Sequence, residues 1–222
     1  MIRLALLASL CLVLAAPARA QALKTDDQKT LYALGLIMGR NIEGMSLSPK
    51  ELEFVKEGFS DAALGHKPKL ELDEWGPKVQ KFAQTRSNAS ADKEKVAGRA
   101  YADKAAKEKG AEKLPDGVVV KILRKGDGPS PQPTDRVKVN YEGRLTNGTV
   151  FDSSYKRGQP AEFALNKVIK CWTEGVGQMH AGGKAQLTCP SDTAYGDHGH
   201  PPTIPGGATL VFDVELLAIN GK

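Results

Sequence analysis

Apolar residues recur at helical spacing in three stretches between residues 31 and 82, and each stretch marks one face of an amphipathic helix. The three series are Leu31, Leu34, Met38 and Ile42, then Leu52, Val55, Phe59 and Ala62, and last Leu72, Trp75, Val79 and Phe82. Ser48, Pro49 and Glu51 predict the start of the second helix, as a cap, a first-turn proline and the partner of a capping box.

Residues 83–112 are rich in Ala, Lys, Glu and Asp but have almost no apolar stripe. One helix from Asp73 to Lys109 would be about 55 Å long and would act as a spacer. Asp73 is its expected cap, which would leave Pro77 in the first turn. The alternative is a partly disordered linker, because residues 87–90 and Gly98 are poor helix formers.

Three apolar helical faces within about sixty residues bury little surface by themselves. Self-association is the simplest way to cover them, so we expect a homodimer through the N-terminal helices. Met38 and Met45 either pack in that interface or form an adaptable surface for client proteins.

From residue 114 onward the pattern changes to short β-rich runs separated by Gly and Pro. Alternation within several runs places one side of each strand on a core. Asn147 and Gly148 predict a hairpin turn, and the one good helix candidate is residues 172–179. An antiparallel sheet wrapped around one short helix gives an α+β fold. The expected strands are residues 118–123, 137–145, 162–165, 185–189 and 210–217.

The first twenty residues predict a cleavable secretory signal. Arg3 precedes the apolar residues 4–16, and small residues at Ala18 and Ala20 follow Pro17. The mature chain would begin at Gln21, and no later stretch is long enough to span a membrane.

The charge argues against nucleic-acid binding. Loss of the signal removes Arg3 and Arg19 and no acidic residue, so the formal charge falls from +5 to +3. The remaining basic and acidic residues are interleaved, as on an ordinary solvated surface.

No conventional catalytic machinery stands out in the sequence. Gly175 and Gly177 lack the rest of a dinucleotide fingerprint, and there is no phosphate loop. His198 and His200 have no further His or Cys nearby, so we expect no metal and no cofactor.

The C-terminal half instead resembles the FK506-binding-protein (FKBP) family of peptidyl-prolyl cis/trans isomerases (EC 5.2.1.8). The similarity extends over about a hundred residues in matching order and spacing. The matching blocks are VNYEG at 139–143, GTVFDSS at 148–154, VIKCWTEGV at 168–176, AYG at 194–196, IP at 204–205 and ATLVFDVELL at 208–217.

This resemblance implies a proline pocket without a reactive group. Trp172 would form its floor, and the Asp152 carboxylate, the Ile169 amide and the Tyr195 hydroxyl would make polar contacts. The expected catalytic residues are Phe151, Trp172, Asp152 and Tyr195. For Phe163, Val168 and Phe212, packing in the core is an alternative role. The remaining residues expected to bind substrate are Tyr141, Phe163, Val168, Ile169, His200, Ile204 and Phe212. FK506-type inhibitors would bind the same pocket.

The signal and the helical arm are similar to the macrophage-infectivity-potentiator branch of the family, whose members are dimers. We therefore expect a signal at 1–20, a helical dimerisation region at 21–70, a long polar helix at 71–113 and an isomerase domain at 114–222. The expected location is the periplasm, with the outer-membrane surface or secretion as alternatives. The partners of the protein would be unfolded or proline-containing exported polypeptides. The alternative function is a dimeric periplasmic holdase chaperone with incidental isomerase activity.

Cys171 stands where the family usually has Gly, directly before the Trp. We expect either a disulfide with Cys189 behind the pocket floor or two buried thiols. A bridge closing a loop of nearly twenty residues would stabilise the fold by about 3 kcal/mol.

Overall fold

The computed structural model describes residues 22–221, in two units that divide between Met38 and Gly39. The predicted signal peptide and Cys11 lie outside the described residues. Helix α1 (Asp26–Arg40) has no buried residue, and Leu31, Leu34 and Ile37 on its apolar positions are exposed. The predicted first helix is therefore present, but it ends at Arg40, so Ile42 of the first apolar series lies outside it.

The second unit begins with the 3₁₀ turn η1 (Glu43–Met45) and helix α2 (Pro49–Ala63). The predicted capping box is confirmed: the Ser48 hydroxyl accepts from the Glu51 backbone N–H, and the Glu51 carboxylate accepts from the Ser48 N–H. Pro49 occupies the first turn, where no backbone donor is needed. Like α1, α2 has no buried residue.

The long helix α3 (Leu72–Ala105) runs without interruption for 34 residues, so the disordered alternative is wrong. The expected cap at Asp73 is also wrong, because α3 already begins at Leu72 with Glu71 at the N-cap. Pro77 consequently lies inside the helix rather than in its first turn. Early in α3, Arg86 pairs with Glu51 of α2 at 2.5 Å.

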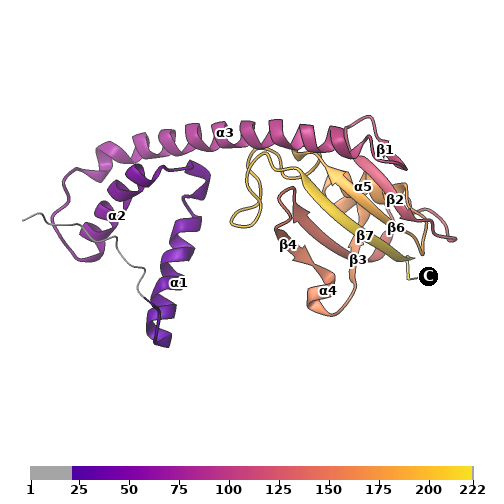
Figure 1. Ribbon diagram of the computed structural model, residues 1–222, viewed down its shortest axis with the longest axis horizontal. Coiled ribbons are helices and arrows are strands. Elements are labelled where there is room, and N and C mark those ends of the chain that lie inside the picture. Colours follow the sequence, from indigo (N-terminus) through magenta and orange to yellow (C-terminus); the bar gives the residue numbers. More distant parts are fainter. Residues whose placement is uncertain (1–21, 222) are drawn as a thin grey trace, which may run out of the picture. The chain divides into compact units, whose positions relative to one another are not determined.

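The C-terminal half, from residue 111 onward, forms one antiparallel sheet, visible at the C-terminal end of α3 (Figure 1). Its strands run in the order β1-β2-β6-β7-β3-β4, and β5 also pairs with β3. The strands are β1 (Ala111–Lys113), β2 (Val119–Arg124), β3 (Arg136–Leu145), β4 (Val150–Ser153), β5 (Ala161–Ala164), β6 (Lys184–Cys189) and β7 (Leu210–Ile219). All five predicted strands are present, the hairpin turn at Asn147 and Gly148 joins β3 to β4, and β1 and β4 were not predicted.

Short helical segments connect the strands. Helix α5 (Lys170–Gly177) is the predicted helix, displaced by two residues toward the N-terminus. The others are α4 (Ser154–Arg157), η2 (Leu165–Lys167) and η3 (Ser191–Thr193). The predicted α+β class, with a helical arm and a sheet around one short helix, is confirmed.

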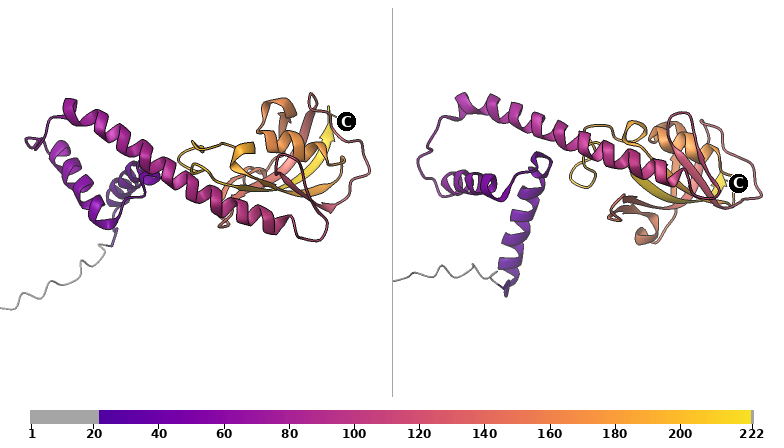
Figure 2. Two further views of the ribbon diagram at one scale, coloured as in Figure 1. Left: turned by 90° about the horizontal axis from the view of Figure 1, so that it is seen from above. Right: turned by 45° about the horizontal axis from the view of Figure 1, so that its top comes forward.

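The two faces of the sheet bury different helices. Val118 and Val120 belong to the main core with Trp172 and Val176 of α5. Val119, between them, points the other way and packs against Ala102 and Ala105 of α3. Successive side chains point to opposite faces of the sheet, so α5 covers one face and the end of α3 covers the other (Figure 2).

A disulfide joins Cys171 of α5 to Cys189 of β6, so the alternative of two buried thiols is wrong. Both cysteines are fully buried. Among residues 22–221, no helix combines the length and the apolar character that crossing a membrane requires.

Candidate functional site

An aromatic cluster surrounds Trp172, which is held at the start of α5 and is 4% exposed. Three rings meet the indole edge-on, at centroid distances of 5.1 to 5.5 Å and interplanar angles of 85 to 90°. They are Tyr141, Phe163 and Phe212. Edge-to-face packing of this kind holds each ring in place through its neighbours.

Gly143 allows the cluster to close. It lies on β3 opposite Phe212 of β7, where the Phe151 and Phe212 rings stand 5.6 Å apart at 87°. A Cβ at Gly143 would lie 2.7 Å from atoms of both rings, so a larger residue would push them apart. Gly143 is the last residue of the VNYEG block, and no local sequence signal marks its role.

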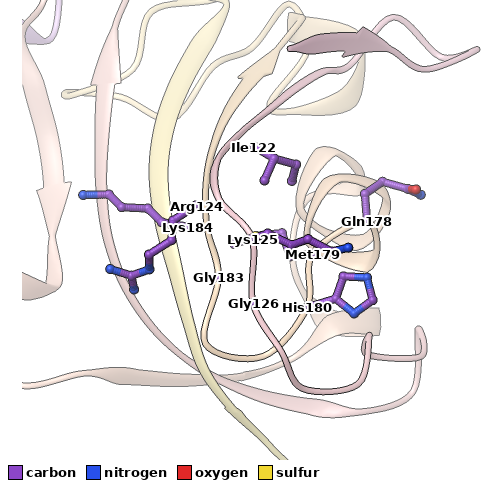
Figure 3. Close-up of a pocket in the computed structure, with 9 residues that line it drawn as sticks. All are labelled: Ile122, Arg124, Lys125, Gly126, Gln178, Met179, His180, Gly183 and Lys184. Carbon is purple, nitrogen blue, oxygen red and sulfur yellow. The ribbon is translucent and has the colours of Figure 1, made fainter.

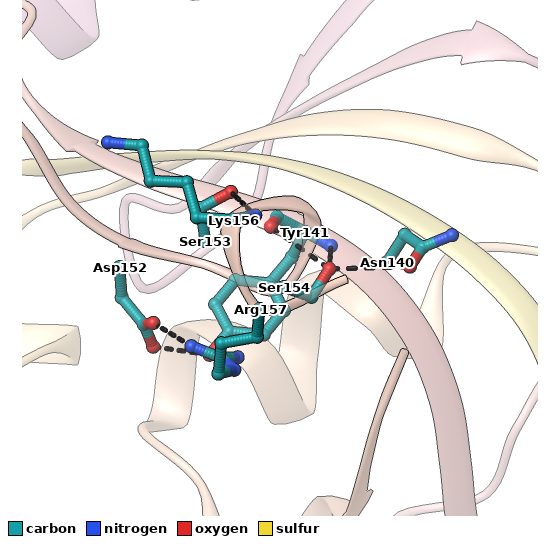
Figure 4. Close-up of polar contacts among 7 residues, drawn as sticks. All are labelled: Asn140, Tyr141, Asp152, Ser153, Ser154, Lys156 and Arg157. Atoms are coloured by element: carbon teal, nitrogen blue, oxygen red, sulfur yellow. Dashed lines mark hydrogen bonds and ion pairs between the residues drawn. The ribbon is translucent and has the colours of Figure 1, made fainter. Parts of the chain in front are cut away.

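The polar side of the cluster is a three-residue network (Figure 4). The Tyr141 hydroxyl donates to the Asp152 carboxylate, and the Arg157 guanidinium donates both to that carboxylate and, at 2.9 Å, to the Tyr141 hydroxyl. Burial raises the pKa of Asp152, but the hydrogen bonds from Tyr141 and Arg157 outweigh it and hold this pKa below its usual value. Asp152 is therefore a fixed carboxylate at neutral pH.

The same network is anchored to the backbone through Ser154. Its hydroxyl accepts from the Tyr141 backbone N–H at 2.9 Å and donates to the Asn140 side chain at 3.3 Å (Figure 4). Ser153 caps the short helix α4, which ends with Arg157. The turn after β4 thus directs Arg157 back onto Asp152.

The β6–β7 loop (residues 190–209) contributes the other predicted residues. Tyr195 is 39% exposed and its ring lies 5.4 Å from that of His200, whereas Ile204 is buried in the core. Burial, together with the nearby charge of Asp152, raises the pKa of the Tyr195 hydroxyl. Tyr195 therefore stays protonated and can donate a hydrogen bond on the side where Asp152 lies.

Val168 and Ile169 pack against the same cluster from the segment before α5. Ile169 is the N-cap of α5, and its carbonyl accepts a hydrogen bond from the backbone N–H of Trp172 at 2.9 Å. Within residues 22–221 its own backbone N–H has no protein acceptor. A free donor therefore stands beside the aromatic floor.

The structure thus packs the predicted apolar residues in one cluster with Trp172, whereas the His200 ring lies against the Tyr195 ring on the β6–β7 loop. A separate cavity of about 350 Å³ lies between the end of β2 and the end of α5, lined by Ile122, Met179 and His180 among others, and none of the predicted residues lines it (Figure 3). Two of its basic residues, Arg124 and Lys184, point their side chains away from it. Among the described residues, no three His, Cys, Asp or Glu side chains are placed to bind a metal ion.

Arg157 is the main residue that the sequence analysis missed. A basic residue five positions after the predicted Asp152, separated from it by a serine cap, was the available signal. The pairing could not be derived from spacing alone, because it depends on the turn that α4 makes.

Comparison with known proteins identifies the family. The family model described as FKBP-type peptidyl-prolyl cis-trans isomerase matches residues 128–217, and the one described as the domain amino terminal to FKBP-type peptidyl-prolyl isomerase matches residues 27–122. The FKBP-type peptidyl-prolyl cis-trans isomerase FkpA of Escherichia coli strain K12 is 42% identical over 213 residues, covering 90% of this chain and 78% of FkpA.

Two further comparisons agree. The peptidyl-prolyl cis-trans isomerase Mip of Coxiella burnetii is 36% identical over 214 residues, covering 91% of each chain. The crystal structure of FkpA from Escherichia coli matches with a TM-score of 0.68 at 38% identity, covering 89% of this chain and 98% of that one. The chain therefore belongs to the FKBP family and is a peptidyl-prolyl cis/trans isomerase.

Proposed function

We propose that the aromatic cluster around Trp172 is the place where this isomerase binds proline, and that its substrates are exported polypeptides that are still folding. The observation that supports this site most strongly is the enclosure of Trp172 by three edge-on rings beside a fixed carboxylate. An apolar pocket of this kind accepts the proline ring and sheds water from the amide before it.

The chemistry requires no nucleophile. Rotation about a peptide bond has a barrier of about 18–20 kcal/mol because amide resonance is lost. In the twisted state the carbonyl is less polar and the nitrogen is pyramidal, so an apolar site binds the twisted amide better than the planar one. Preferential binding of that state lowers the barrier.

Three groups have separate roles in this mechanism. The Ile169 N–H and the Tyr195 hydroxyl donate hydrogen bonds to substrate carbonyls and hold the chain on either side of the proline. Asp152, kept ionised by Arg157, presents a negative charge to the dipole of the amide that turns. His200 and Ile204 shape the loop side of the pocket.

Paired tyrosine variants test the site. Tyr195→Phe removes one hydrogen bond and should lower kcat/KM for an X-Pro peptide about three- to tenfold. Tyr155→Phe is the matched control, since Tyr155 is an exposed tyrosine on α4 with no part in the pocket. Equal activities in the two variants would contradict the assignment of Tyr195.

Export is proposed from the predicted signal at residues 1–20. Periplasmic residence fits the substrate class, because exchange of an X-Pro bond takes tens of seconds or longer and can limit the folding of secreted chains. Amino-terminal sequencing of the protein recovered from the periplasmic fraction should read Gln21 first. Recovery of uncleaved protein in the cytoplasmic fraction would refute the location.

A homodimer through the N-terminal helices is proposed from their uncovered faces. Ile37 of α1 is 60% exposed, and Val55 and Phe59 of α2 are 41% and 51% exposed. Burying such side chains releases roughly 1.5–3 kcal/mol each, so a second copy is a favourable partner. The alternative occupant, an unfolded client held by a chaperone, would use the same faces.

Sedimentation of the full chain separates these occupants. Ile37→Glu should convert a dimer into a monomer, whereas Gln28→Glu should not, because Gln28 lies nine residues earlier and therefore on the opposite side of the same helix. A wild-type monomer that suppresses aggregation of an unfolded protein would favour the chaperone instead. A dimer that persists in Ile37→Glu would show that this face is not the interface.

A further inference from the structure

One face of α3 is built to lie against the β6–β7 loop and the sheet. Ala91, Lys95, Gly98, Ala102 and Ala105 follow each other at spacings of four and three residues, so they share a side of the helix. Four of them are Ala or Gly, and all four of these are buried. Small residues let the helix backbone approach closely, and the contacts show where it does.

The closest approach is to the C-terminal end of the loop. Gly207 has a φ of +75° and lies against the backbone of Ala91, where a Cβ would come within 2.8 Å of the Ala91 carbonyl carbon. Gly98 faces Thr209, and a Cβ on Gly98 would lie 2.8 Å from the Thr209 Cβ. Thr209 is 4% exposed, so it cannot turn away into solvent.

The charged contact is to the middle of the loop. The Lys95 ammonium pairs with Asp197 and lies 3.9 Å from Asp192. Asp197 is two residues after Tyr195 and three before His200. The hydrogen bond with Asp197 raises the pKa of Lys95, so the ammonium stays charged.

Hydrogen bonds within the loop connect these contacts to Tyr195. The Gly207 N–H donates to the Gly196 carbonyl at 2.9 Å, and the Gly199 N–H donates to the Tyr195 carbonyl at 3.2 Å. The Gly196 N–H in turn donates to the Ser191 carbonyl at 2.9 Å. A displacement at Asp197 or Gly207 therefore moves the backbone on both sides of Tyr195.

We propose that α3 positions the β6–β7 loop of the isomerase, with Lys95 and Gly98 as positioning residues for Tyr195 and His200. This rests on the proposed role of the loop in binding substrate. The helix α3 then has two roles. Its first part connects to the N-terminal helices, and its second part sets the geometry of the pocket. The second part of α3 thus contributes to catalysis without touching the substrate.

Two matched pairs in the full chain test the proposal. Lys95→Met should lower kcat/KM about two- to fivefold, as loss of one partly exposed ion pair predicts. Lys93→Met makes the same change at an exposed position of the same helix and should leave it unchanged. Gly98→Ala should lower kcat/KM about tenfold through the clash with Thr209. Gly76→Ala, where the helix has open space, should not.

Rescue separates positioning from general destabilisation. The exchange Lys95→Asp with Asp197→Lys should restore activity, as should Gly98→Ala with Thr209→Gly. Amide NMR shifts should change in residues 190–209 of Lys95→Met and stay in place in β3. Activity in Lys95→Met equal to that of Lys93→Met, or a loss that the exchange does not restore, would overturn the proposal. Tyr195→Phe in the same assay reports on the proposed role of Tyr195: retained activity there overturns that assignment, whereas retained activity in Lys95→Met alone overturns only the positioning role.

Discussion

The disulfide between Cys171 and Cys189 should stabilise the catalytic half strongly without being needed for catalysis. The bond joins α5 to β6 across a sequence separation of 18 residues. Closing a loop of that size removes about 3 kcal/mol of chain entropy from the unfolded state. For a domain of roughly a hundred residues this corresponds to a fall in melting temperature of about 14 °C on reduction.

Catalysis should survive reduction because other contacts hold the pocket floor. Trp172 and Val176 stay packed in the core with Leu187 of β6, and the ring contacts of Trp172 do not involve either sulfur. Well below the melting temperature, kcat/KM should therefore change less than about twofold, which is no more than the loss of one weak contact would cause. Stability and activity should separate.

Urea unfolding of oxidised and reduced protein measures the effect. The chain has two tryptophans, so a Trp75→Phe background leaves Trp172 as the only reporter, directly beside the bond. Under denaturing, non-reducing conditions the oxidised mature chain, with its proposed start at Gln21, should have no free thiol, and the reduced chain two, at Cys171 and Cys189. Equal urea midpoints for the two forms, with the thiol counts as stated, would refute the stabilising role.

Other consequences of the geometry are open to measurement. Gly143→Ala should lower kcat/KM about tenfold, because the new Cβ meets the Phe151 and Phe212 rings and overpacking of this kind costs about 1–3 kcal/mol. Gly177→Ala, with nothing nearby, is its control, and equal kinetics in the two variants would contradict a tight pocket. Arg157→Met should raise the pKa of Asp152, because it removes hydrogen bonds that lower it. Wild-type activity should therefore persist down to about pH 4, near the ordinary Asp pKa, and the variant should lose activity at a higher pH. The stability that depends on ionised Asp152 is present above that ordinary pKa and disappears as the pH falls through the lower folded value, so the acid unfolding midpoint should also rise in the variant. Superimposable pH profiles would show that Arg157 does not control Asp152.

The elements that could be predicted are those whose signal is local. The capping box at Ser48 and Glu51, the hairpin turn at Gly148 and the alternation in β3 and β7 are each set by residues close in sequence, and all are present. Strand β1 was missed because its three residues pair only with β2 and bury almost nothing. The cap of α3 was misplaced because Asp is a favoured N-cap residue and Glu is not, and the actual N-cap, Glu71, makes no side-chain capping bond.

The second half of α3 shows the limit of periodicity as a signal. A stripe of large apolar residues would have predicted burial, but this face is made of Ala and Gly, which also suit an exposed helix. Their meaning depends on what approaches them, here Thr209 and Val119. The spacing was visible in the sequence, but the contact partner, more than a hundred residues away in the case of Thr209, was not.

The proposed site could be expected only from the family resemblance, and its chemistry explains why. A search for a nucleophile, a metal ligand or a phosphate loop finds nothing because twisting an amide needs none of them. The pocket depends on the enclosure of Trp172 by rings from β3, β5 and β7, and on a carboxylate whose charge is fixed by Arg157. Each of those residues has an ordinary structural role when taken alone. Their function arises from the sheet register that places Gly143 opposite Phe212 and leaves room for the rings to meet. The residues most worth changing in this enzyme are therefore the small ones, Gly143 in the proposed pocket and Gly98 on α3, because each marks a place where, under the proposed mechanism, geometry rather than reactivity would set the rate.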